Sequence, residues 1–168
     1  SSEVATTLGG RYMIQEVYPY SLVEYLKANN LILKNNWEYD SEIVNHIQRI
    51  FPSYFYYGGF PESVRLVEKR SWLSVLFQKI FLGDLIARYK VRNETSLKLL
   101  VKKLSESINQ PSSFNRLANI VSSAGQKIQT STVIDYVRFM EDSWLLFSMS
   151  NYAAKFAEKE SAKKYYFR

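Results

Sequence analysis

The sequence contains no cysteine and only one histidine, His46. The lack of cysteine excludes disulfides, thiolate metal sites and cysteine nucleophiles, and it rules out a small secreted scaffold held by disulfides. A histidine-rich metal site cannot be built, and Ser-His-Asp catalysis would depend on His46 alone. We interpret His46, which lies beside Ile47 in a predicted helix, as a structural residue. The sequence therefore predicts no metal site.

Long apolar runs and phosphate-binding loops are lacking as well. No run approaches the ~20 residues that cross a bilayer, so we expect no membrane partner. The pairs Gly9-Gly10 and Gly58-Gly59 are not followed by the Lys-Ser or Lys-Thr of a P-loop. We expect this chain to contain no catalytic residue, to hold no cofactor and to be inactive as an ATPase. The sequence starts at Ser1-Ser2, without an initial Met and without a signal-peptide pattern, and its last residues, Lys163–Arg168, have the pattern of a strand cut short. We therefore expect a segment of a longer cytoplasmic protein.

The composition that is present suits a folded domain. Of the 168 residues, 46% are hydrophobic, 23% are charged and 15% are aromatic, which is ample for a core. The positive charge is concentrated in the middle, because residues 65–103 carry ten Lys or Arg and three Asp or Glu. Such an excess marks a nucleic-acid surface, an acidic partner or a solvated helix face, and we favour the last.

The first two thirds of the chain show mostly helical periodicity. Alternation over Met13–Tyr18 predicts a strand, and Ser21 with Glu24 predicts a capping box that begins a short helix. Asp40 or Ser41 begins the next helix, which a Gly-Gly pair and a proline end near residue 60. Helical patterns follow over residues 62–91 and 94–108. In the first of these, Asp84 and Arg88 have the spacing of an i,i+4 ion pair.

The last third has the element order of a winged helix-turn-helix. Ser112 or Ser113 begins one helix, Gly125 supplies the turn, and Thr130 or Ser131 begins the next helix. Two strands are predicted, over residues 144–149 and 163–167. The predicted fold class is therefore mainly α, a helical lid and connector followed by a winged helix-turn-helix with a short β-hairpin.

The second helix of this motif holds the candidate nucleic-acid contacts. They are the basic and polar side chains at or after its start: Lys127, Gln129, Thr130, Ser131 and Arg138. Asp135, Glu141 and Asp142 lie on the same helix and make it a poor phosphate-binding face. The motif can therefore serve DNA binding or equally a protein-interaction or interdomain scaffold.

Several short motifs, taken in order, resemble a large prokaryotic group. The group comprises uncharacterised AAA-family P-loop ATPases with a C-terminal domain of unknown function. The resemblance covers almost the whole chain and is carried by Ser1-Ser2, Gly10-Arg11, Tyr18–Leu26, Tyr57–Glu62, Asp84–Arg88, Ser131–Tyr136, Leu145-Leu146 and Lys164–Phe167.

The resemblance implies a longer parent protein and a role for each part of this chain within it. Residues 1–62 would finish an ATPase core and begin its helical lid, residues 63–110 would form a helical connector, and residues 111–168 a truncated winged helix. ATP and Mg would bind to the parent's missing N-terminal core, which is the implied partner. Ser1, Ser2 and Arg11 would lie near the nucleotide, and the other family-motif positions are Gly58, Gly59, Phe60, Pro61, Asp84 and Arg88.

The function that follows from this resemblance is a nucleotide-responsive regulatory or interaction module without a P-loop of its own. The alternatives are a winged-helix DNA-binding protein and a protein-interaction scaffold.

Overall fold

The computed structural model describes residue 13 and residues 15–167. Within them the chain is mainly helical and has a short two-stranded antiparallel sheet, which confirms the predicted class. The chain forms two compact units, Ser1–Phe77 and Gln78–Arg168, which are described separately below. The predicted boundaries after residues 62 and 110 differ from this division and stay predictions about function.

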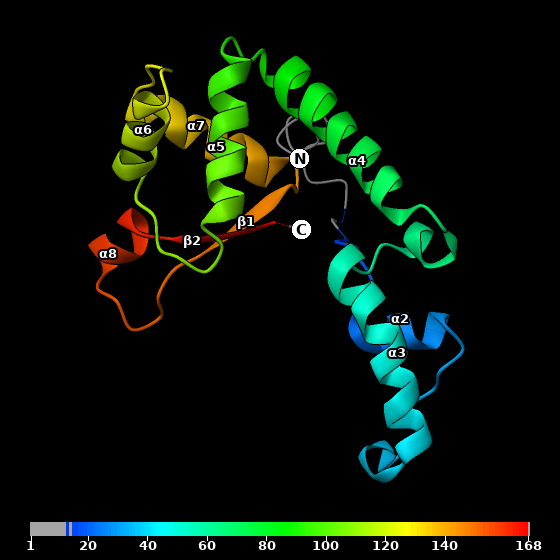
Figure 1. Ribbon diagram of the computed structural model, residues 1–168. Coiled ribbons are helices and arrows are strands. Elements are labelled where there is room, and N and C mark those ends of the chain that lie inside the picture. Colours follow the sequence, from blue (N-terminus) through cyan, green and yellow to red (C-terminus); the bar gives the residue numbers. More distant parts are fainter. Residues whose placement is uncertain (1–12, 14, 168) are drawn as a thin grey trace. The chain divides into compact units, whose positions relative to one another are not determined.

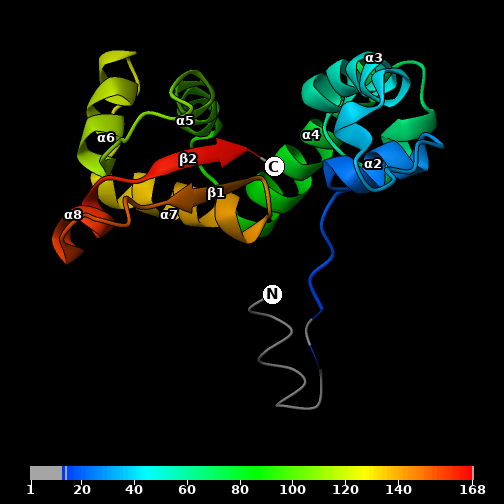
Figure 2. The same ribbon diagram turned by 90° about the horizontal axis from the view of Figure 1, so that it is seen from below.

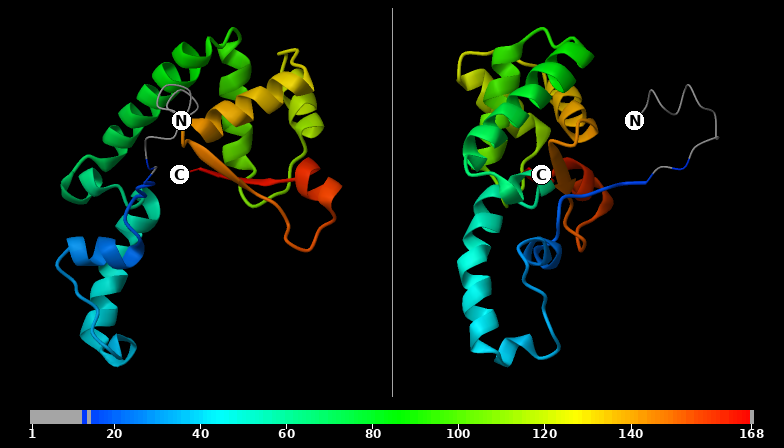
Figure 3. Two further views of the ribbon diagram at one scale, coloured as in Figure 1. Left: turned by 180° about the vertical axis from the view of Figure 1, so that it is seen from behind. Right: turned by 90° about the vertical axis from the view of Figure 1, so that its right-hand side faces the viewer.

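Unit 1 is built from helices α2 (Leu22–Ala28) and α3 (Ser41–Tyr57), two 3₁₀ turns (Trp37–Tyr39 and Pro61–Arg65) and most of α4 (Lys69–Lys79). Helix α2 packs across α3 (Figure 3). The predicted capping box is confirmed, since Ser21 Oγ accepts from the amide of Glu24 and the Glu24 carboxylate accepts from the amide of Ser21. Asp40 caps α3, which continues through Pro52 to Tyr57.

The strand predicted over Met13–Tyr18 is wrong. Residues 13 and 15–18 are irregular and exposed. Alternation of side chains favours a strand only where a neighbouring strand satisfies the backbone groups, and the described residues of unit 1 include no strand.

Unit 2 contains the sheet (Figure 1). Its strands β1 (Leu146–Met149) and β2 (Lys164–Phe167) lie side by side in Figure 2, with Ser148 opposite Tyr165. The amide of Ser112 also donates to the carbonyl of Lys163 at 3.0 Å, which ties the chain before α6 to β2. The helices are α5 (Glu94–Glu106), α6 (Phe114–Ser123), α7 (Thr130–Asp142) and α8 (Phe156–Ser161).

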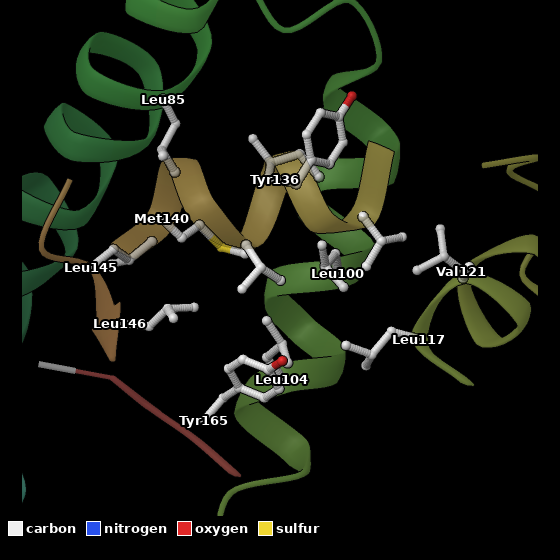
Figure 4. Close-up of a cluster of buried hydrophobic side chains, with 14 of the residues drawn as sticks. Leu85, Leu100, Leu104, Leu117, Val121, Tyr136, Met140, Leu145, Leu146 and Tyr165 are labelled. Atoms are coloured by element: carbon white, nitrogen blue, oxygen red, sulfur yellow. The ribbon is translucent and has the colours of Figure 1, made fainter. Parts of the chain in front are cut away.

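The core of unit 2 draws on every layer of the unit. Figure 4 shows Leu100 and Leu104 of α5, Leu117 of α6, Met140 of α7 and Tyr165 of β2 pointing toward one another. Each is at most 3% exposed. The amphipathic patterns of the three helices and the alternation of the strands therefore converge on one core.

Two details of the helices differ from the predictions. The helical pattern predicted over residues 62–91 is interrupted at residues 66–68, and α4 is followed by a π-helical segment, η3 (Ile80–Ala87), that periodicity alone did not indicate. Helix α7 begins at Thr130 with Gln129 before it, so neither Thr130 nor Ser131 is its cap. The Thr130 hydroxyl donates to Asn115 Oδ1 of α6 at 2.9 Å, which joins the start of α7 to α6.

Candidate functional site

The glycine motif of unit 1 is a close backbone contact. Gly58 ends α3 with a φ of 72°, a conformation that favours glycine. The carbonyl of Gly59 accepts from the amide of Tyr20 at 2.7 Å, and a Cβ on Gly59 would lie 2.1 Å from the Tyr20 carbonyl oxygen. The segments around Tyr20 and Gly59 thus meet here; the contact requires glycine at 59, and the positive φ favours glycine at 58.

The rest of the glycine motif also packs locally. The ring of Phe60 meets that of Trp72 edge-on, with 5.6 Å between ring centroids. The backbone carbonyl of Phe60 accepts from the buried Ser63 hydroxyl. Pro61 opens the following 3₁₀ turn. Phe60 and Pro61 therefore fix the path of the chain from α3 to α4.

A polar cluster around Lys69 lies in the same unit. Its Nζ donates to Ser53 Oγ at 2.8 Å and to the Tyr25 hydroxyl at 3.1 Å, and it faces the rings of Tyr25 and Tyr57 within 6.0 Å. The cluster joins α2, α3 and the start of α4. Sequence reasoning missed it, because the three elements are separated by loops and no residue spacing signals their contact.

Asp84 and Arg88 lie in or next to the π-helical segment. Asp84 is half-buried and Arg88 is exposed. Their i,i+4 ion pair stays a prediction, and the backbone around them is π-helical, with hydrogen bonds between residues five apart. Beside them, burial raises the pKa of Tyr89; the charge of Asp142 adds to this and that of Arg88 opposes it.

Helix α7 carries more acidic than basic side chains, since Asp135, Glu141 and Asp142 outnumber Arg138. Arg138 pairs with Asp135 at 3.1 Å and lies over the ring of Phe139. Asp142 accepts from the hydroxyl of Tyr89 at 3.4 Å. The single arginine of the candidate recognition helix thus lies in an exposed i,i+3 ion pair, on a helix with three carboxylates.

The remaining candidate contacts gather before and at the start of α7. Lys127, Gln129 and Ser131 are exposed, whereas Thr130 is half-buried and bonded to α6. These residues lie near one another as predicted, but they bring together one cation and three neutral groups. This set can donate hydrogen bonds and supplies little charge for a phosphate backbone.

The described cations of α5 and the loop before it are, by contrast, unpaired. Lys90, Arg92, Lys98 and Lys102 are exposed and Lys103 is half-buried. Within residues 15–167 none of the five forms an ion pair, although Lys98 lies over the ring of Phe81. This segment therefore has the strongest unneutralised charge in the described part of unit 2.

The hollow between α5 and α6 has a volume of about 190 Å³. Leu99, Ile120, Val121 and Ala124 supply its apolar surface, and Lys102, Lys103 and Glu106 its polar rim. A larger hollow of about 400 Å³ lies beside the β-hairpin, next to Lys164 and Tyr166. Both of these groups donate to Asn109 Oδ1, at 2.9 and 3.2 Å, so the polar side of the larger hollow is partly satisfied internally.

Three further predicted positions, Ser1, Ser2 and Arg11, lie outside the described residues. His46 is exposed on α3.

Among the residues that the structure describes, no three His, Asp or Glu side chains gather as metal ligands. The described helices also include none with the length and apolar character that a bilayer requires.

Residues 48–168 match the family described as a domain of unknown function, DUF8612. The chain belongs to this family. The DUF8612 match includes the glycine motif, the π-helical segment and all of unit 2, whereas Tyr20 and Tyr25, which complete the contacts of unit 1, precede it.

Two curated relatives extend the comparison beyond the DUF8612 match. The chain is 27% identical over 161 residues to the uncharacterized protein MJ1544 of Methanocaldococcus jannaschii, covering 92% of this chain and 35% of that protein. It is 29% identical over 154 residues to an uncharacterized protein of Haemophilus influenzae, covering 90% of this chain and 36% of that protein. The chain thus spans about a third of the length of these relatives. No solved structure matches it.

Proposed function

We propose that this chain is the interaction module of a larger AAA-family ATP-binding protein, and that its winged-helix unit contacts a protein. The observation that carries the protein-binding role is the charge of α7, whose only cation, Arg138, pairs with Asp135 at 3.1 Å and is outnumbered by three carboxylates. A DNA-reading helix needs free cations or amides that reach phosphates and base edges. A face with few cations and with exposed Ile134 and Gln129 suits a protein surface better.

The winged-helix assignment is supported by the order of elements in unit 2. Helices α5, α6 and α7 precede the β1–β2 hairpin, and the bridge from Ser112 to Lys163 adds a short third pairing. The link to an ATP-binding parent is supported by the sequence motifs and by the length of the relatives outside the match. In this proposal ATP and Mg bind elsewhere in the parent, and nucleotide state changes what the module contacts.

A second candidate function is DNA binding, and the unpaired cations between Lys90 and Lys103 favour it. The two functions separate in a fluorescence-anisotropy titration with a labelled duplex of ~20 base pairs at ~50 mM and ~200 mM salt. We expect no saturable binding at either salt concentration. Saturable binding that weakens steeply with salt would replace the interaction role by DNA binding.

The proposed parent is tested in the relatives themselves. We expect a Gly-rich loop ending in Lys-Ser or Lys-Thr in the part of the Methanocaldococcus protein that lies outside the match. We also expect calorimetry to detect no ATP binding to this chain alone. A relative without such a loop, or micromolar ATP affinity of this chain, would contradict the ATPase link.

A further inference from the structure

The hollow between α5 and α6 combines an apolar floor with unpaired positive charge. Its floor includes the half-buried side chains of Leu99 and Ile120 together with the exposed Ala124. Helices α5 and α6 lie near each other in Figure 1 and contact each other directly. Both supply residues that line the hollow. A volume of about 190 Å³ suits one large apolar side chain inserted from outside.

The charge around this hollow is mostly positive. Lys102 and Lys103 lie on its rim, and neither forms an ion pair within the described residues. Arg116 precedes Ile120 by one helical turn on α6 and is exposed. Glu106 is the one carboxylate among the described lining residues.

More cations lie toward the start of α5. The side-chain amide of Asn93 donates to Gln126 Oε1 at 3.3 Å, which joins the loop that carries Arg92 to the turn that carries Lys127. Both of these cations are exposed, and Glu94 is the nearest acidic residue in the sequence. Two further exposed cations are thus carried by the segments that precede α5 and follow α6.

We propose that this surface binds an acidic amphipathic helix, which inserts one apolar side chain between α5 and α6 and sets its carboxylates against Lys102 and Lys103. This inference rests on the proposed interaction role and names its partner class. Apolar anchors supply affinity in such grooves, and complementary charge selects the partner. A duplex would satisfy the lysines and leave the apolar floor unused.

The test uses the whole chain and three labelled peptides of ~16 residues, about four helical turns. The first carries leucines on one face and glutamates on the other. The second keeps the leucines and replaces the glutamates by lysines, and the third keeps the glutamates and replaces the leucines by serines. We expect saturable binding of the first and at least ~10-fold weaker binding of the other two.

Matched charge reversals locate the site. We expect Lys102→Glu to weaken binding of the acidic amphipathic peptide about fivefold, whereas Lys155→Glu, on the exposed segment before α8, leaves it unchanged. Methyl resonances of Leu99 and Ile120 should shift on addition of the peptide. Circular dichroism of both variants reports whether the fold is kept.

Several outcomes would overturn the inference. They are no saturable binding of the acidic amphipathic peptide at ~1 mM, equal binding of the lysine peptide, or equal effects of the two reversals. If any of these results is found while the duplex also fails to bind, the hollow between α5 and α6 is not the binding site, and the proposed interaction role stands. Duplex binding that Lys102→Glu removes would overturn both.

Discussion

At the scale of single residues, Gly59 is the position with the least freedom. Its carbonyl bonds to the amide of Tyr20, and there is no room for a Cβ beside the Tyr20 carbonyl. The chain can therefore close the contact between the segment before α2 and the end of α3 only with glycine at this position.

Gly59→Ala is expected to destabilise unit 1 by about 3 kcal/mol or more, because the new Cβ would lie 2.1 Å from backbone oxygen. Chemical denaturation followed by circular dichroism measures the change. Gly83→Ala is the matched control, since a Cβ there meets nothing within 4 Å and alanine favours helix by about 0.5–1 kcal/mol. Equal effects of the two substitutions would contradict this account.

Glu24 gives unit 1 a pH dependence at the acid side. Hydrogen bonds from the Ser21 amide and hydroxyl lower the pKa of Glu24 below its ordinary 4.5. A lowered folded-state pKa means that the stabilisation is fully present above the unfolded pKa and is lost as pH falls through the folded one. Acidification should therefore weaken the start of α2.

The measurement compares the wild type with Glu24→Gln, which keeps the capping geometry and does not titrate. We expect the wild type to be the more stable protein at neutral pH, and the difference to shrink as the pH falls below 4.5. A difference that stays constant over this range would show that the carboxylate charge contributes nothing.

At the scale of elements, α3 and α5 have opposite surroundings. No side chain of α3 is buried, and Phe51, Phe55 and Tyr56 are exposed along it. The ring centroids of Phe51 and Phe55 lie 5.8 Å apart, and those of Phe55 and Tyr56 lie 5.6 Å apart. Helix α5 instead buries Leu97, Leu100 and Leu104 in the core of unit 2. The two helices therefore differ in how much tertiary packing stabilises them.

Leu104→Ala on α5 is expected to cost about 3 kcal/mol of the free energy of unfolding, because the side chain is 1% exposed and its loss leaves a cavity. Leu82→Ala makes the same chemical change at a side chain that is 53% exposed. Leu82→Ala should lower the free energy of unfolding by well under ~1 kcal/mol. Urea denaturation of the two variants gives both values, and similar values would place the core elsewhere.

Elements governed by local chemistry were predictable from the sequence. Ser21 with Glu24 and Asp40 before α3 act on neighbouring amides, and Gly125 after α6 adopts a positive φ of 88°, so these residues predict the helix ends. The π-helical segment was not predictable, since its residues also fit an α-helical pattern.

The sites depended on contacts that sequence spacing does not reveal. Lys69 meets Ser53 and Tyr25 only after three elements have packed. The Arg138–Asp135 pair, by contrast, has the i,i+3 spacing that the sequence shows. The sequence predicted the cations of Lys90–Lys103. It did not predict the hollow between α5 and α6, which arises from the packing of the two helices.

At the scale of the whole molecule, the two units differ in core size. Among the described residues of unit 1, the buried apolar side chains are Tyr25, Leu26 and Leu31. Unit 2 has a continuous core drawn from three helices, the π-helical segment and both strands. A smaller core stabilises less, so unit 1 should open more readily.

Hydrogen exchange on the whole chain tests this difference. We expect amides of α5 and α7 to be the most protected, and those of α3 to exchange at least ~10-fold faster. Two-dimensional NMR resolves the individual amides. Protection of α3 equal to that of α5 would indicate that a second molecule covers the aromatic side chains of α3 in solution.

The pairing of Ser112 with Lys163 has a consequence for the order of folding. Tyr165, which is 3% exposed, and the carbonyl that Ser112 needs both come from residues synthesised long after α5 and α6. Helices α5, α6 and α7 can form as they leave the ribosome, but their shared core stays open on one side until β2 has emerged. During that interval the nascent chain exposes leucines that the finished protein hides, which makes this stage the one most exposed to misassembly and to chaperone binding.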